Sequence, residues 1–219
     1  MKRVTHLKAA VKAILCSYIA SISRGPPPEY RPCHCGHHFR HRHKVEHCYV
    51  AVGFWSELVP VLYLRCPACG SVRNLRPRFL PPRSPYPWVL RQEAILAYRQ
   101  LGSYRRAAAA FEINWQTLWR WADRLARAAE RLERFLLEQL LACNVARTAA
   151  LAQEAGRLTP ARAGPGWRTR AISRAPLLLE LALSLWQEGS RLGLNWGEPQ
   201  AEDAMRFLGV CARETGLRL

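Results

Sequence analysis

The sequence predicts a mainly α-helical protein with one small β-sheet. Apolar residues recur with helical spacing near the N-terminus and again from residue 88 onward, whereas β-branched and aromatic residues cluster between about residues 49 and 75. Two Pro-rich stretches separate these regions. We therefore expect an amphipathic helix and Pro-rich breaker at 1–28, the small sheet at 29–76, a Pro/Arg connector at 77–87, a three-helix unit at 88–126, a helical extension at 127–155, a Pro/Gly/Arg loop at 156–170 and C-terminal helices at 171–219.

The charge of the chain narrows the class of partner. Its 219 residues include 33 Lys and Arg against 16 Asp and Glu, a net charge of +17, which attracts polyanions and makes nucleic acid the expected partner. A membrane surface or an acidic protein would suit the same charge, but the helical module described below favours double-stranded DNA. Apolar residues make up 49% of the chain, enough for hydrophobic cores, which argues against a disordered tail. No apolar stretch reaches the roughly twenty residues of a membrane span. We expect no membrane association and a cytoplasmic, nucleoid-associated location.

Two cysteine turns are the most informative motif. Cys66-Pro67-Ala68-Cys69-Gly70 is preceded by Cys33-His34-Cys35-Gly36, and two such turns can complete a tetrahedral Zn²⁺ shell, as in a zinc ribbon. The expected ligands of this structural zinc are Cys33, Cys35, Cys66 and Cys69. Because the first pair is closer than the usual Cys-x-x-Cys-Gly spacing, His38 is a reserve ligand.

Other interpretations of this region stay open. The cysteines could be reduced thiols in a β-hairpin, beside a solvated tract of histidines that comprises His34, His37, His38, His41, His43 and His47. That tract could instead bind several further metal ions. The remaining cysteines, Cys16, Cys48, Cys143 and Cys211, are expected to be buried small apolar residues.

The elements around the cysteines follow from composition. We expect a helix at about 5–22, strands at about 49–54 and 59–65, and a third strand at 72–75. The connector contains Arg76, Arg78 and Arg83 between prolines, so it either lies along a phosphate backbone or is a plain spacer.

From residue 88 the pattern predicts three short helices. Gly102 ends the first, Ser103 caps the second and Asn114 caps the third. Their expected inward residues are Leu90, Ala94, Tyr98 and Leu101 in the first, Tyr104, Ala107, Ala108 and Phe111 in the second, and Leu118, Trp121 and Leu125 in the third. A short turn between the last two helices indicates a helix-turn-helix.

The N-terminal, outward residues of the third helix would then lie in the major groove. Those residues are Trp115, Gln116, Thr117 and Arg120, and Arg105, Arg106 and Arg124 would contact phosphates. Gln pairs well with adenine and Arg with guanine. The alternative is a three-helix bundle with a solvated basic face.

The apolar stripe continues beyond residue 124 through Leu125, Ala129, Leu132, Leu136 and Leu140. It could pair two copies as a homodimer through the helical region after residue 125. Alternatively, it packs on C-terminal helices expected at about 174–192 and 198–214.

These motifs resemble the zinc-ribbon plus helix-turn-helix front end of bacterial transposases and related transposon-derived proteins of uncharacterised function. The resemblance covers about residues 31–126 and rests on the two cysteine turns, the stretch 75–81 leading to Tyr86, the run 103–108 and the run 117–121. It implies DNA binding.

The nuclease domain of such transposases needs three carboxylates around two metal ions. No such domain is recognisable in this sequence, so we predict a sequence-specific DNA-binding protein that is not an enzyme. Two alternatives are a reduced transposase or accessory DNA-processing protein and a histidine-rich metal-binding protein.

Overall fold

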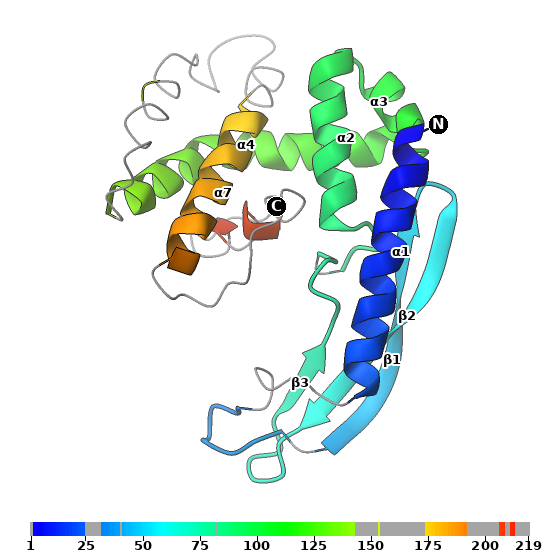
Figure 1. The fold of residues 1–219 in the computed structure, drawn as a ribbon, viewed down its shortest axis with the longest axis vertical. Coiled ribbons are helices and arrows are strands. Elements are labelled where there is room, and N and C mark those ends of the chain that lie inside the picture. Colours follow the sequence, from blue (N-terminus) through cyan, green and yellow to red (C-terminus); the bar gives the residue numbers. More distant parts are fainter. Residues whose placement is uncertain are drawn as a thin grey trace. The chain divides into compact units, whose positions relative to one another are not determined.

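A computed structural model describes residues 2–24, 32–39, 41–81, 83–142, 153, 174–191, 206–208 and 211–212. The described chain is mostly helical and contains one three-stranded antiparallel sheet, which confirms the predicted mainly α class with a small β component (Figure 1). Residue contacts divide it into two compact units, 1–87 and 88–219.

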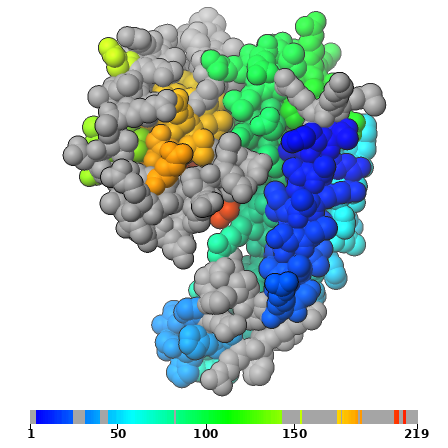
Figure 2. All heavy atoms as spheres, viewed as in Figure 1, coloured from blue at the N-terminus to red at the C-terminus, as the bar shows by residue number. Residues whose placement is uncertain are grey.

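Helix α1 (Lys2–Ser23) packs along the sheet of the first unit, as both the ribbon and the space-filling view show (Figures 1 and 2). It begins at Lys2 rather than near residue 5. The residues that it buries are spaced by three, four or seven positions, which places them on one helix face. They are Val4, Leu7, Val11, Leu15 and Ile22.

The sheet consists of β1 (His41–Val52), β2 (Trp55–Arg65) and β3 (Val72–Leu75), in that order. Only β3 has the predicted bounds. Val52 pairs with Trp55, so the hairpin turn is Gly53-Phe54, and Gly53 has a φ of 61° at the first turn position, where a type II′ turn favours glycine. The prediction placed this turn too late because Phe54 resembled a strand residue.

Strand β1 also begins earlier than predicted, since the polar segment His41–Cys48 pairs with residues 59–65 of β2, where the buried residues of that strand lie. Contacts across the strands compensate for its weak strand propensity. The Tyr63 hydroxyl, for example, donates a 2.7 Å hydrogen bond to the Glu46 carboxylate.

The Pro/Arg connector packs on the first unit and is not a plain spacer. Leu80 is buried, Phe79 makes an edge-to-face contact with Tyr18 at 6.4 Å between ring centroids, and the Ala51 amide donates a 2.8 Å hydrogen bond to the Pro85 carbonyl. Arg78 and Arg83 are exposed, as expected, whereas Arg76 is half-buried and donates to the Ser84 carbonyl at 3.3 Å.

The second unit begins with α2 (Trp88–Leu101), α3 (Tyr104–Ala110) and α4 (Trp115–Ala142). The predicted inward residues are buried with two exceptions: Tyr104 is half-buried and stacks on Tyr98 at 3.9 Å, and Leu101 is 42% exposed. Leu101 is exposed because it is the last residue of α2, before Gly102 ends the helix with a φ of 62°.

Both predicted N-caps are confirmed. Ser103 Oγ accepts from the Arg106 amide, and Asn114 Oδ1 accepts from the Gln116 amide at 2.8 Å. Helix α3 ends in a Schellman motif, in which the Ile113 amide donates to the Ala108 carbonyl and the Glu112 amide to the Ala109 carbonyl. Glu112 has a φ of 53°, a conformation that favours glycine.

Helix α4 runs unbroken for 28 residues, so the predicted boundary at 126/127 does not divide two elements. No Pro or Gly interrupts it. The stripe from Leu125 to Leu140 is buried, and α7 (Ala175–Arg191) packs against α4. Arg174 and Glu133 form a buried ion pair with 2.8 Å between Nη2 and Oε1.

The stripe therefore packs within one chain, as the second interpretation proposed, and does not offer an open seam to a second copy. Helix α7 lies close to the predicted 174–192. Of the second predicted C-terminal helix, residues 206–208 and 211–212 are helical. The predicted loop at 156–170 lies outside the described residues.

The Asn114 cap yields a stability prediction. Asn114→Ala removes the acceptor for the Gln116 amide and should lower the free energy of unfolding of the second unit by about 1 kcal/mol. Asn114→Ser keeps a capping acceptor and should change it by a few tenths of a kcal/mol at most. Urea unfolding followed by far-UV circular dichroism measures both variants. Equal stability of wild type and Asn114→Ala would contradict the capping role.

Candidate metal centre and basic helical surface

The four predicted cysteines converge in the first unit. The Sγ atoms of Cys33, Cys35, Cys66 and Cys69 lie within 4.8 Å of one another. Contacts between the two turns join Cys33 to Cys69 at 3.5 Å and Cys35 to Cys66 at 3.6 Å. These separations far exceed a disulfide bond, and all four are free thiols. The cluster could hold one metal ion.

The two cysteine turns have the same design at different lengths. In the first turn the Cys33 amide donates to the His37 carbonyl at 2.7 Å, and in the second the Cys66 amide donates to the Ser71 carbonyl at 2.9 Å. Gly36 and Gly70 directly follow the second cysteine of each turn, with φ of 81° and 70°, a conformation that glycine adopts without strain. The first turn is one residue shorter than the second, and it still places Cys33 and Cys35 in the cluster.

The reserve ligand His38 is not part of this cluster. His38 is exposed, and its backbone forms an isolated β-bridge with Pro32. The nearer imidazoles are His34, with Nδ1 3.6 Å from Cys33 Sγ, and His37, with Nδ1 3.6 Å from Cys35 Sγ. Among the residues that the structure describes, the candidate donor set is thus four cysteines without a histidine.

Sequence reasoning missed Ser71, whose hydroxyl lies 3.1 Å from Cys33 Sγ and 3.0 Å from Cys69 Sγ. A serine directly after the Cys-Gly pair was the available signal. Hydrogen bonds to a thiolate stabilise its charge and orient it as a ligand.

The thiols differ in acidity. A hydrogen bond from the Cys35 backbone, followed by one from the Ser71 hydroxyl, lowers the pKa of Cys33 to about 6. Hydrogen bonds from the Ser71 side chain and backbone lower the pKa of Cys69. At Cys35 a hydrogen bond from the His37 backbone acts in the lowering direction, but desolvation and the neighbouring thiols together raise its pKa to about 12. A bound cation would remove this conflict, because it favours the ionised form of every ligand.

The cluster forms one end of the core of the first unit. Cys33 and Cys66 are buried together with Phe39, Leu64 and Leu75, and Ile22 of α1 packs against the same group. Apolar residues of α1, β2 and β3 thus pack with the cysteine turns in one core.

The other cysteines only partly follow the prediction. Cys211 is buried as expected and Cys48 is half-buried, whereas Cys16 is exposed. Cys16 follows the buried Leu15 on α1 and lies about 100° round the helix from it, away from the sheet. Cys143 lies outside the described residues.

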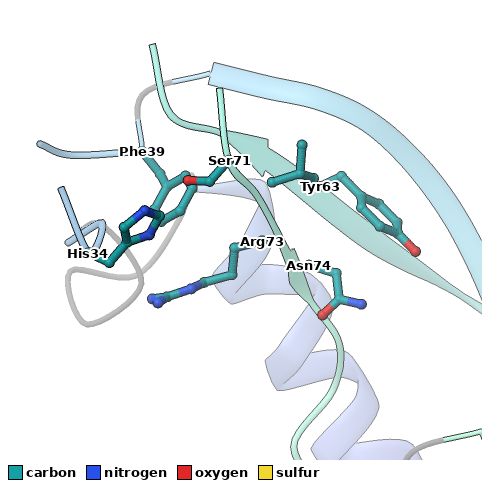
Figure 3. A pocket seen from close by; sticks show the side chains of 7 residues that line it. His34, Phe39, Tyr63, Ser71, Arg73 and Asn74 are labelled. Carbon is teal, nitrogen blue, oxygen red and sulfur yellow. The ribbon is translucent and has the colours of Figure 1, made fainter. Parts of the chain in front are cut away.

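A shallow pocket lies beside the cysteine turns and was also missed by sequence reasoning (Figure 3). The Arg73 guanidinium lies 5.2 Å from the centre of the Phe39 ring and donates to the Pro32 carbonyl at 3.4 Å. Its lining comes from three segments that are separate in the sequence, so no local sequence motif predicts it. The lining residues are His34, Phe39, Tyr63, Ser71, Val72, Arg73 and Asn74.

The residues predicted to contact DNA lie on α3 and on the first turns of α4. Gln116, Arg120 and Arg124 are exposed at intervals of four residues, which places them on one face of α4. Trp115 is 42% exposed and lies 5.9 Å from the Arg105 guanidinium, while Thr117 is half-buried. Arg106 is also exposed.

Comparison of the chain with protein-family models, with curated proteins and with solved structures finds no match. Among the described helices, none has the length and apolar character needed to cross a membrane.

The thiol cluster predicts a single metal site. Titration with Co²⁺ should saturate at one equivalent and give thiolate-to-cobalt absorption bands. Cys66→Ser should abolish tight binding because Cys66 Sγ is buried within the cluster, whereas Cys16→Ser, an exposed thiol on α1, should bind like wild type. Undiminished binding by Cys66→Ser would contradict the assignment.

Proposed function

We propose that this protein is a sequence-specific binder of double-stranded DNA, in which a structural zinc stabilises a zinc ribbon and α4 enters the major groove. The observation that carries the proposal is the row of exposed residues on the first turns of α4, Gln116, Arg120 and Arg124. A transposase-like origin without a nuclease domain agrees with the sequence resemblance, and a nucleoid-associated location would follow.

The packing of α2, α3 and α4 supports a helix-turn-helix. Helices α3 and α4 are joined by the short segment 111–114, and both contact α2. In a helix-turn-helix the second of two such helices carries the base-reading residues near its N-terminus. The apolar face of α4 is buried, so its polar face is the one presented to a ligand.

The exposed side chains suit this role chemically. Gln116 offers an amide for adenine and Arg120 a fork of donors for guanine, while Thr117 can contact a base or a phosphate. Trp115 offers an exposed apolar ring. Arg105 and Arg106 on α3, with Arg124 on α4, are exposed cations suited to phosphate contacts that position the reading helix.

The donor set favours zinc as the metal. A tetrahedral Zn²⁺ with Zn–S bonds of about 2.3 Å requires sulfur–sulfur distances of about 3.8 Å. The separations of 3.5 and 3.6 Å between the turns lie close to that value. Four thiolates leave no open position for a substrate, which suits a structural metal.

The proposal is tested by selecting bound sequences from a random duplex pool at physiological salt, with zinc-loaded protein and a chelated control. We expect an enriched motif. Its loss or weakening on chelation would show that binding also needs the first unit, which the metal would stabilise, in addition to α4 in the second unit. Enrichment of no motif would overturn sequence-specific binding. Divalent-metal-dependent cleavage of the duplexes would favour the alternative of a reduced transposase, and binding of several weak zinc ions would favour a metal-binding protein.

The reading role of α4 predicts a sequence-dependent loss. Arg120→Ala should weaken binding to the selected motif by about 1–3 kcal/mol and leave binding to unrelated duplexes nearly unchanged. Arg134→Ala changes an exposed arginine on the same helix, outside its first turns, and should have little effect on either. Fluorescence anisotropy at one fixed salt concentration compares the variants. An equal loss on all sequences would assign Arg120 to phosphate contacts instead.

A further inference from the structure

Arg91 in the first turn of α2 is a buried cation held between aromatic rings. The side chain is 4% exposed, and its guanidinium carbon lies 5.1 Å from the ring centres of both Trp88 on the same helix and Trp121 on α4. Cation–π contacts of this kind fix the orientation of a guanidinium and offset part of its desolvation. They do not satisfy its N–H donors.

Within the part of the chain that the structure describes, no carboxylate forms an ion pair with Arg91, and its buried Nε has no hydrogen-bond partner. Burial is the main cause that lowers the pKa of Arg91, to about 10, and the positive charge of Arg124 lowers it further. Arg91 therefore stays charged at neutral pH. Arg124 follows Trp121, whose ring contacts the Arg91 guanidinium, by three residues on α4, which places this second cation on the adjoining part of the helix surface. An uncompensated buried charge is costly unless a counter-charge arrives.

The second buried arginine of this unit provides an internal comparison. Arg174 is also almost fully buried, but Glu133 pairs with it at 2.8 Å. Asp123, the carboxylate next to Arg124 in sequence, is in a 2.6 Å ion pair with Arg127. Among the described residues of this unit, acids thus pair with Arg174 and Arg127, whereas the interactions found at Arg91 are those with two rings and a like charge.

We propose that Arg91 and Arg124 together bind one backbone phosphate of the DNA, with Trp88 and Trp121 holding the Arg91 guanidinium in place. This inference rests on the proposed function and adds a residue that sequence reasoning did not select. Arg91 lies in the first turn of α2, which contains no acidic residue and where unpaired amides and the helix dipole favour an anion. Arg124 shares its helix face with Gln116 and Arg120, so a strand read by those residues passes close to this pair of cations.

The geometry suits phosphate better than a lone carboxylate. Two guanidinium groups can share the several oxygens of one phosphate group, and arginine forks match phosphate geometry. The shared chemistry is a phosphate group, whether free or in a DNA backbone. Inorganic phosphate and duplex DNA therefore serve as separate probes.

The binding test compares three variants of the full-length zinc-loaded protein. Arg91→Met removes the charge at similar volume, Arg91→Lys keeps the charge without the fork, and Arg99→Met changes an exposed arginine in the last turn of the same helix. We expect Arg91→Met to weaken binding about tenfold to the selected motif and to unrelated duplexes alike. The slope of log K against log salt should fall by about one, with Arg91→Lys intermediate and Arg99→Met unchanged.

A second measurement on the wild-type protein holds even if Arg91→Met fails to fold. The NMR resonance of the Arg91 Nε–H group should shift on addition of sodium phosphate, compared with sodium chloride at equal ionic strength, while that of Arg99 stays in place.

If wild type binds its motif and Arg91→Met matches it in affinity and salt slope, the phosphate contact is wrong and the proposed function stands. If wild type binds no DNA, the proposed function fails. The phosphate titration then decides between an anion site for another phosphate ligand, shown by a shift, and no anion site.

Discussion

The convergence of four cysteine thiols constrains the rest of the first unit. The cysteine turns lie at the open end of the β1–β2 hairpin, because His41 pairs with Arg65 and the thiols follow or precede these residues closely in sequence. The strand pairing of the hairpin thus brings the two turns together, and the short distances between their sulfur atoms limit how far apart the turns can lie. Ile22 of α1 and Leu75 of β3 complete the same core. A metal bound there would link three segments that apolar packing alone holds over a small area.

Local sequence signals predicted much of this structure. Ser103 and Asn114 cap their helices as expected, and the four cysteines meet, because caps and cysteine turns depend on a few adjacent residues. The predictions failed where partners distant in sequence decide the outcome. The polar segment that opens β1 is a strand because β2 lies beside it, and Cys16 is exposed because the sheet covers a different face of α1. Arg91 was not selected from the sequence, since its contact with Trp121 joins residues 30 positions apart.

The continuity of α4 determines how the proposed reading surface is held. At about 1.5 Å per residue, its 28 residues extend over about 42 Å. Its exposed first turns are continuous with a buried stripe, where Leu132, Leu136 and Leu140 are inaccessible to solvent. Glu133 and Arg174 fix this packing, because a buried ion pair tolerates little sliding of the two segments that carry it. The side chains at the start of α4 are therefore presented by a rigid element whose remainder is packed, and this would limit the conformational entropy lost in binding the proposed DNA ligand.

The turn before α4 contains a residue in a backbone conformation that lowers the stability of the folded protein. Glu112 adopts a φ of 53° at a Schellman position where glycine costs less, so this turn carries a small local strain. Arg91, which contacts Trp121 of the same helix, is buried, its Nε has no hydrogen-bond partner, and no carboxylate of the described residues pairs with it. Both features lower the stability of the folded protein. Among the described residues, the contacts that offset the burial of the Arg91 charge are those with the two indole rings. Features that cost stability in the free protein are retained most readily where a ligand restores the balance. A phosphate at Arg91 and Arg124 would restore it by supplying the missing negative charge at the edge of the proposed reading surface.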